Sequence, residues 1–203
     1  MTIQEKVAAI ERFPLRINTK IELLLVLTGH KKATTIFVYG KTVSFENADS
    51  PPASKLRIKT IQNFLSRLGL PYQILSADSI RNKDHDEKYE RVLICIGHDD
   101  QSLHSIASMW QKLSKERYPL ADKVHGNLSG FPKSAVRAYL QQDLMPFNEQ
   151  QAHTKDLEYD HFCQFRFSKD HWQEELKTAE RWAQEVKILS PQLYTKFITM
   201  TVK

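Results

Sequence analysis

Apolar residues recur along much of the chain at intervals of three or four positions, which is the period of an amphipathic helix. Near the N-terminus this pattern covers residues 3–10 and 21–27, and Pro14 interrupts it, which predicts two helices or one broken helix. Further helices are predicted at 56–68, 102–113 and 135–140. A C-terminal amphipathic helix is predicted after Ser168, with an apolar stripe formed by Trp172, Leu176, Ala179, Ala183, Val186 and Leu189.

Shorter stretches rich in β-branched and aromatic residues predict strands at 34–39, 42–45, 72–75 and 162–167. One further segment, 92–96, is apolar at every position. A strand without a polar face is typical of a sheet that is covered on both sides. We therefore expect residues 92–96 to form the central strand, and the residues that follow it to reach a crevice at the end of the sheet.

The alternation of helices and strands predicts an α/β protein with a mixed or mostly parallel sheet and helices packed on its faces. A length of 203 residues fits a single domain, 1–203. Polar residues at 47–52 and 78–90 indicate loops. Residues 141–160 show no clear period, which predicts a long loop or linker before a C-terminal strand–helix element.

Two features bear on where the protein works. The chain has no apolar stretch near the roughly 18–20 residues that a membrane span requires, and its N-terminus has no signal-peptide pattern. Cys95 and Cys163, far apart in apolar segments, are expected to be reduced and buried. These features predict a soluble cytoplasmic protein without a membrane partner.

The chain carries a net charge of +5, and the excess is N-terminal: residues 1–80 hold 11 Lys and Arg against 6 Asp and Glu. Such a bias is compatible with an anionic partner, either a small molecule or a nucleic acid. A solvated basic surface is the simpler alternative. The histidine and cysteine spacings match no common metal site, and no cofactor is identified by a motif.

The first candidate site directly follows the predicted central strand. His98 could act as an acid/base, with Asp99 or Asp100 orienting it or sharing a metal ion. This arrangement would suit a hydrolase or a transferase. In the alternative, the two aspartates cap the next helix and His98 is merely exposed.

The second candidate is a glycine-containing segment before the helix at 135–140. It offers His125, Gly126, Ser129, Gly130 and Lys133, a set that could cradle a phosphate. Its glycines match neither the dinucleotide-binding nor the Walker spacing. A simple turn at a helix start, with both glycines at positive φ, is the alternative.

The third candidate is the basic pair Lys31 and Lys32, close in sequence to the aromatic residues of strand 34–39, a combination that single-strand nucleic-acid binders use. A sheet core beside a solvated loop explains the same residues. Taken together, the pattern favours a binding module for an anionic ligand, such as a nucleotide, a phosphate-containing metabolite or a nucleic acid.

Overall fold

The computed structural model describes residues 1–41, 55–76, 80–82, 87–114 and 120–199. By their internal contacts the residues group into two compact units. The helical unit comprises Met1–Lys32 and Pro119–Lys203, and the sheet unit comprises Ala33–Tyr118. This grouping does not by itself define separately folding domains, so the single domain stays a prediction.

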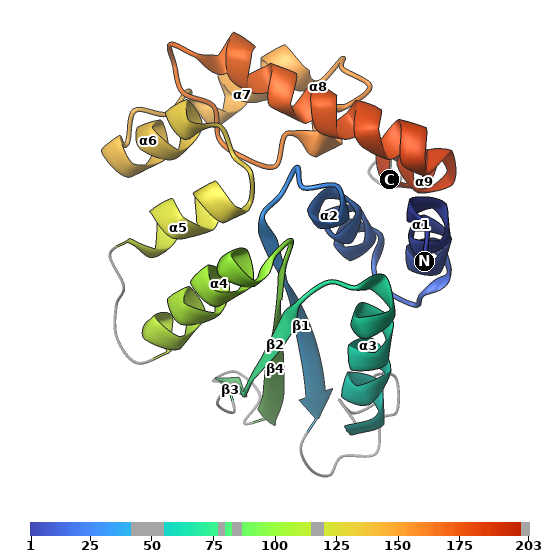
Figure 1. The fold of residues 1–203 in the computed structure, drawn as a ribbon. Coiled ribbons are helices and arrows are strands. Elements are labelled where there is room, and N and C mark those ends of the chain that lie inside the picture. The colour runs from blue at the N-terminus through green and yellow to red at the C-terminus, as the bar shows by residue number, and fades with distance from the viewer. Residues whose placement is uncertain (42–54, 77–79, 83–86, 115–119, 200–203) are drawn as a thin grey trace. The chain divides into compact units, whose positions relative to one another are not determined.

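The sheet unit contains four described strands and two described helices. In chain order these are β1 (Ala33–Lys41), α3 (Lys55–Leu68), β2 (Tyr72–Ser76), β3 (Ile80–Asn82), β4 (Glu87–Gly97) and α4 (Asp100–Leu113). The strand order is β1-β4-β2, and β3 also pairs with β4. Helix α4 contacts β1, β2 and β4, and in Figure 1 the strands run between α3 and α4.

Strand β4 lies in the middle of the sheet, which confirms the prediction for residues 92–96. Thr34 of β1 pairs with Ile96 on one side of β4, and Ile74 of β2 pairs with Ile94 on the other. Successive side chains of a strand point to opposite faces, and every residue from Val92 to Ile96 is buried. Both faces of β4 are therefore covered along residues 92–96.

The prediction of a mixed or mostly parallel sheet is wrong, because all described strand pairs are antiparallel. An all-apolar strand indicates that both faces are covered, whichever way its neighbours run. The segment 78–90 is likewise not only a loop, since β3 and the start of β4 pair within it. Backbone hydrogen bonds form this ladder, so polar side chains do not exclude it. The strand expected at 42–45 and the loop at 47–52 lie outside the described residues.

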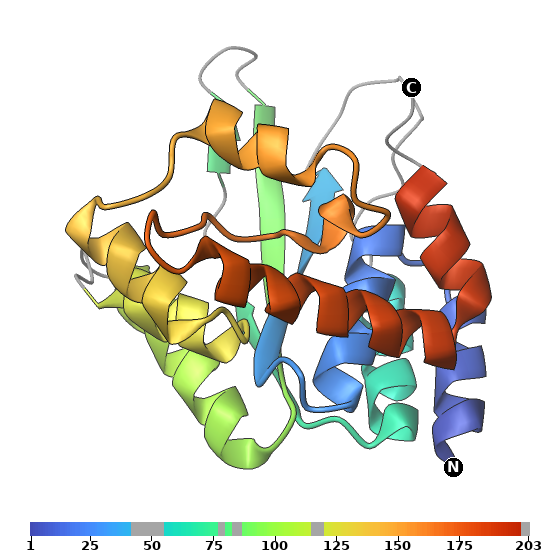
Figure 2. The ribbon, with the colours of Figure 1, turned by 90° about the horizontal axis from the view of Figure 1, so that it is seen from above.

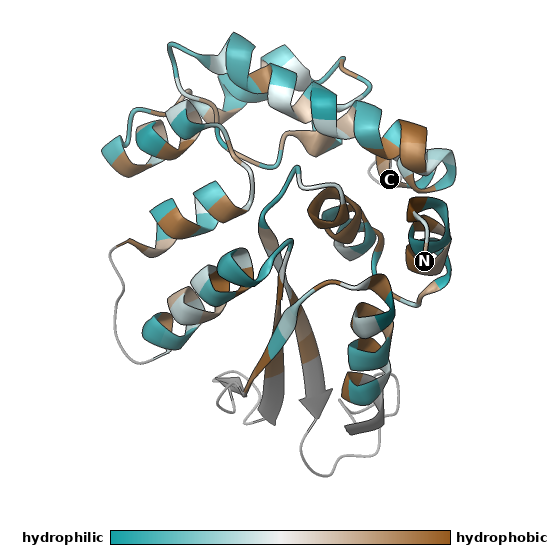
Figure 3. Cartoon of the chain, in the orientation of Figure 1, coloured by the Kyte–Doolittle hydropathy of each residue, from teal (hydrophilic) through white to brown (hydrophobic). Residues whose placement is uncertain are grey.

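The helical unit is built from seven described α-helices and one 3₁₀ turn. They are α1 (Ile3–Arg12), α2 (Ile17–Leu27), α5 (Ala121–Leu128), α6 (Lys133–Gln141), α7 (Phe147–Thr154), the turn Asp160–Phe162, α8 (Trp172–Leu189) and α9 (Pro191–Thr199). Helix α2 is apolar around most of its circumference (Figure 3), and it contacts α1, α8 and α9. Figure 2 shows α9 leaving the end of α8 at an angle.

The C-terminal amphipathic helix is confirmed as α8, but the segment before it differs from the prediction. Helix α7 lies inside 141–160, and residues 162–167 form no strand. The side chain of Gln150 bonds the backbone of this segment instead, accepting from Phe167 N and donating to Phe165 O, both at 3.0 Å. A single bridge, Leu144 to Ser168, is the only described strand-like pairing there. None of the described helices is long and apolar enough to cross a bilayer.

Candidate functional site

A cavity of about 230 Å³ in the helical unit is the best-formed candidate site in the described part of the chain. Helix α5, helix α6 and the irregular segment at 164–166 form its walls. The lining residues are Asp122, His125, Gly126, Phe131, Ala135, Val136, Tyr139, Gln164, Phe165 and Arg166. It thus combines aromatic and aliphatic walls with a few polar groups, which is the usual make-up of a small-molecule site.

Helical spacing brings the lining residues of α5 and α6 onto facing sides. Asp122, His125 and Gly126 follow one another at positions i, i+3 and i+4, so they share one face of α5. A Cβ atom on Gly126 would lie 2.7 Å from Val136 Cγ2, so only glycine lets the two helices approach this closely. Gly126 therefore lies inside α5 as a packing residue, and its role in binding a phosphate stays a prediction.

The rest of the predicted glycine segment forms the turn between α5 and α6. Gly130 has a φ of +73° and ends the helix in the left-handed region that glycine tolerates. Ser129 is buried and its N–H donates to the His125 carbonyl, while Lys133 is exposed at the start of α6. Of the five predicted residues, His125 and Gly126 line the cavity, whereas these three lie outside its described lining.

Arg166 is the lining residue with an unused hydrogen-bond donor. Its Nη2 donates to the Met145 carbonyl at 2.7 Å, and its guanidinium lies 5.4 Å from the centre of the Phe147 ring. Its Nε is buried and finds no hydrogen-bond partner among the described residues. A buried donor without a partner is costly, and a guanidinium is well shaped to bind a carboxylate or phosphate.

Lys31 lies behind the cavity wall and not on the surface. Only 2% of its side chain is exposed. Its Nζ donates to Glu22 Oε1 at 2.6 Å and to Gln164 Oε1 at 2.8 Å, and it lies 4.7 Å from the centre of the Trp182 ring. Burial lowers the pKa of Lys31, although the carboxylate of Glu22 partly opposes this effect. Lys32, in contrast, is exposed, as predicted for a basic surface residue.

The hydrogen bond from Lys31 determines which end of the Gln164 amide remains available to a ligand. An ammonium group can only donate, so the Gln164 atom facing it must be the carbonyl oxygen. The NH₂ end of the same amide then remains for other partners. Gln164 is one of the lining residues, so its NH₂ group is a candidate donor to a ligand in the cavity.

His125 is a neutral group of the cavity at neutral pH. Burial on the cavity side is the largest cause that lowers its pKa below 6.5, and the charge of Lys31 lowers it further. Glu22 and Asp122 act in the opposite direction. Solvent still reaches the residue, and its ring stands edge-on to Phe131 with 6.4 Å between the ring centres.

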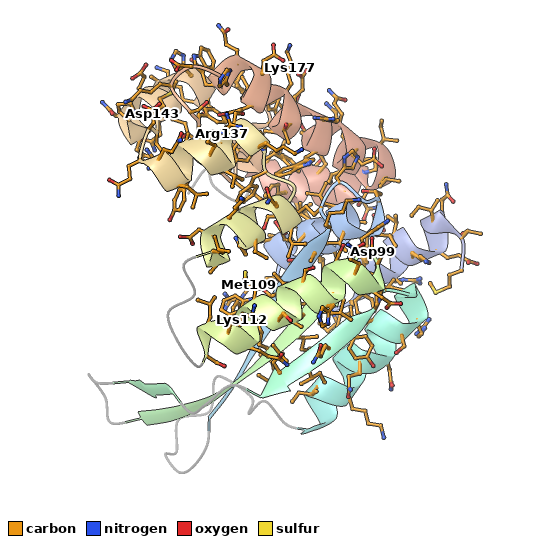
Figure 4. All side chains as sticks on the ribbon, turned by 60° about the vertical axis from the view of Figure 1, so that its left-hand side comes forward. Asp99, Met109, Lys112, Arg137, Asp143 and Lys177 are labelled. Carbon is orange, nitrogen blue, oxygen red and sulfur yellow. The ribbon has the colours of Figure 1, made fainter. Side chains whose placement is uncertain are left out.

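The candidate site after β4 belongs to the sheet unit. Asp99 caps helix α4, its Oδ1 accepting from Ser102 N at 2.7 Å, and Figure 4 shows it at the opposite end of the helix from Lys112. Asp99 and Asp100 line a shallow, open depression, while His98 is exposed beside them. The capping bond fits the simpler interpretation, and a catalytic role for His98, Asp99 and Asp100 stays a prediction.

Sequence reasoning missed four polar lining residues, Asp122, Tyr139, Gln164 and Arg166. A signal existed for two of them, since Gln164 and Arg166 alternate with aromatic residues in the segment 162–167. Within the described ranges, no group of three or more His, Cys, Asp and Glu side chains is arranged to hold a metal ion. No known family model, curated protein or solved structure matches the chain.

Proposed function

We propose that this protein is a binding module for an anionic small molecule, with the cavity of the helical unit as its site. The observation that carries the proposal is Arg166, which lines the cavity and keeps a buried Nε without a partner among the described residues. Arg166 is the cation of the lining, and an anionic oxygen in the cavity can pair with its guanidinium group.

The charges around the cavity support an anion over a cation. Lys31 is paired with Glu22, so these two charges largely cancel. His125 is neutral at neutral pH because its pKa is lowered. Arg166 and the exposed Asp122 are the charged residues of the lining, and Arg166 is the less solvated of the two. Solvent screens Asp122 more than Arg166, so the positive charge acts more strongly on a ligand inside the cavity.

The size of the cavity supports a small molecule over a nucleic acid strand. About 230 Å³ lies below the roughly 300–1,000 Å³ of ordinary drug-sized ligand sites. The exposed lysines Lys32 and Lys133 can attract anions from solution, but their exposure offers no enclosed site. The ligand is therefore expected to be compact.

The test compares two variants that each remove one arginine charge. Calorimetric titration of the full chain with acetate, benzoate and inorganic phosphate identifies the anions that bind. Arg166→Gln should weaken binding of such an anion by about 10- to 100-fold, the effect of losing a charged hydrogen bond. Arg181→Gln, exposed on α8, should leave it within twofold. Equal losses in both variants, or no anion bound at all, would show that the cavity is not an anion site.

A further inference from the structure

Two aromatic side chains, Phe131 and Phe165, line the cavity. The rings of Phe131 and Phe165 have centres 5.4 Å apart at an angle of 40°. Both also contact Trp182, with ring centres at 6.3 Å and 5.9 Å, and Trp182 is almost fully buried. Because the three rings support one another, the wall is fixed before a ligand arrives. Such a wall suits a planar ring, which packs on it in an offset or edge-on manner.

The volume of the cavity fits a ligand part with one ring. A cavity of about 150 Å³ accommodates benzene, so a volume of about 230 Å³ leaves roughly 80 Å³ beyond a six-membered ring. That remainder equals the share of two or three water molecules at about 30 Å³ each, which is room for a carboxylate. A base, a sugar and a phosphate together do not fit within it.

The polar groups of the cavity match a carboxylate better than a phosphate. Gln164 and Arg166 flank Phe165 in sequence and supply the two donors described above, which two carboxylate oxygens can share. A phosphate dianion brings about twice the charge. Arg166 is the cation of the lining, and Asp122 in the same lining would repel a second negative charge.

We infer that the ligand is a small carboxylic acid that carries a single aromatic ring. This inference rests on the proposed function, because it concerns the same cavity. The ring packs against Phe131 and Phe165, and the carboxylate accepts hydrogen bonds from Arg166 and Gln164.

The experiment measures the affinity of the full chain for benzoate, acetate and adenosine monophosphate by calorimetry. We expect benzoate to bind at least tenfold more tightly than either of the others. If acetate binds as well as benzoate and both depend on Arg166, the aromatic inference is wrong but the anion site stands. If adenosine monophosphate binds most tightly through Arg166, the ligand is a nucleotide and the inference is again wrong. If no binding depends on Arg166, both proposals fail.

Two variants test whether the aromatic ring of the ligand lies inside the cavity. Ala135 is buried in the lining, so Ala135→Leu should fill the space and weaken benzoate at least tenfold, while Ala152→Leu on the exposed face of α7 should not. Asp122 is exposed and its replacement by asparagine should preserve folding, so Asp122→Asn covers the case in which Ala135→Leu fails to fold. Removal of this repelling charge should tighten benzoate about two- to fivefold. Unchanged binding in Ala135→Leu, or weaker binding in Asp122→Asn, would overturn the inference.

Discussion

Single side chains decide what the cavity can bind, and Lys31 shows how. A buried ammonium group pays a large desolvation penalty unless it is paired and hydrogen-bonded. Lys31 has Glu22 and Gln164 as acceptors and the Trp182 ring beneath its charge. Its bond to Gln164 fixes the amide of a lining residue. The charge that the sequence suggests as an outer contact for a ligand thus acts from inside the protein.

Exchanging the Gln164 amide for a carboxylate tests this role. Gln164→Glu keeps an acceptor for Lys31 but replaces the NH₂ donor with a negative oxygen. We expect benzoate affinity to fall at least tenfold while the urea midpoint of unfolding does not decrease. Gln151→Glu adds the same charge at an exposed position of α7 and should leave both quantities unchanged. Full affinity in Gln164→Glu would show that this amide does not face the ligand.

The pH dependence of binding should report His125. Its pKa is lowered below 6.5, so the imidazole gains a proton only under mildly acidic conditions. Protonation then adds a positive charge to the cavity, so anion affinity should rise only once the pH falls below 6.5, which titrations between pH 8 and pH 5 measure. This range lies above the pKa of an ordinary carboxyl group, about 4, so the ligand stays ionised. The anion affinity of His125→Gln should not change over this pH range. His153 is exposed, and His153→Gln should keep the pH dependence of the wild type.

At the scale of elements, the side chain of Gln150 makes hydrogen bonds that a partner strand would otherwise make. Phe162, Phe165 and Phe167 are buried, and their backbone runs beside α7 without a partner strand. The Gln150 amide satisfies a donor and an acceptor of this segment at once. A buried backbone group must be bonded somewhere, and here a helix side chain supplies the bonds.

Removing that amide should loosen the wall of the cavity. Gln150→Leu leaves Phe165 O and Phe167 N without their partner, and each buried unsatisfied group costs about 1–3 kcal/mol. We expect the free energy of unfolding to fall by about 2–4 kcal/mol in urea denaturation. Gln151→Leu at the neighbouring exposed position should change it by less than about 0.5 kcal/mol. Equal effects of the two substitutions would contradict the bridging role.

The elements also show which parts of the fold could be predicted from the sequence. Period and burial pattern were sufficient for α1, α2, α8 and the central place of β4, because side-chain hydrophobicity determines them. The direction of the strands depends on connections that the pattern of a strand does not encode. Residues 162–167 resemble a strand in composition, yet tertiary bonds from Gln150 decide their conformation. Of the ten residues that line the cavity, His125 and Gly126 were among the predicted site residues, whereas Arg166 required a fold in which a distant segment meets α5 and α6.

At the scale of the whole molecule, each compact unit contains one cysteine. Cys95 lies in β4 and Cys163 in the helical unit, and both thiols are free. Burial raises the pKa of each to about 12, and Asp160 contributes for Cys163. In an unfolded chain a thiol ionises near pH 9. Each unit therefore contains a thiol whose ionisation is coupled to unfolding at alkaline pH.

Stability should decrease above pH 9 through both thiols. Between pH 9 and 12 the folded thiol keeps its proton while the unfolded one loses it, so the folded state binds more protons and stability falls as the pH rises. Each thiol can contribute up to about 1 kcal/mol per pH unit. Urea unfolding at pH 8 and pH 10 should show a smaller decrease in Cys95→Ala and in Cys163→Ala than in wild type. If both variants lose as much stability between pH 8 and pH 10 as the wild type does, the thiols are not the cause of this loss.

The helical unit is discontinuous in sequence, and this has a consequence during synthesis. Helices α1 and α2 leave the ribosome before α8 and α9, which contact α2 and follow only after residues 28–171. At about 5–20 residues per second, translation of that stretch takes roughly 7 to 29 s. Throughout this interval the leucines of α2 lack their final cover. The nascent chain therefore exposes apolar surface of α2 until the C-terminal helices are made.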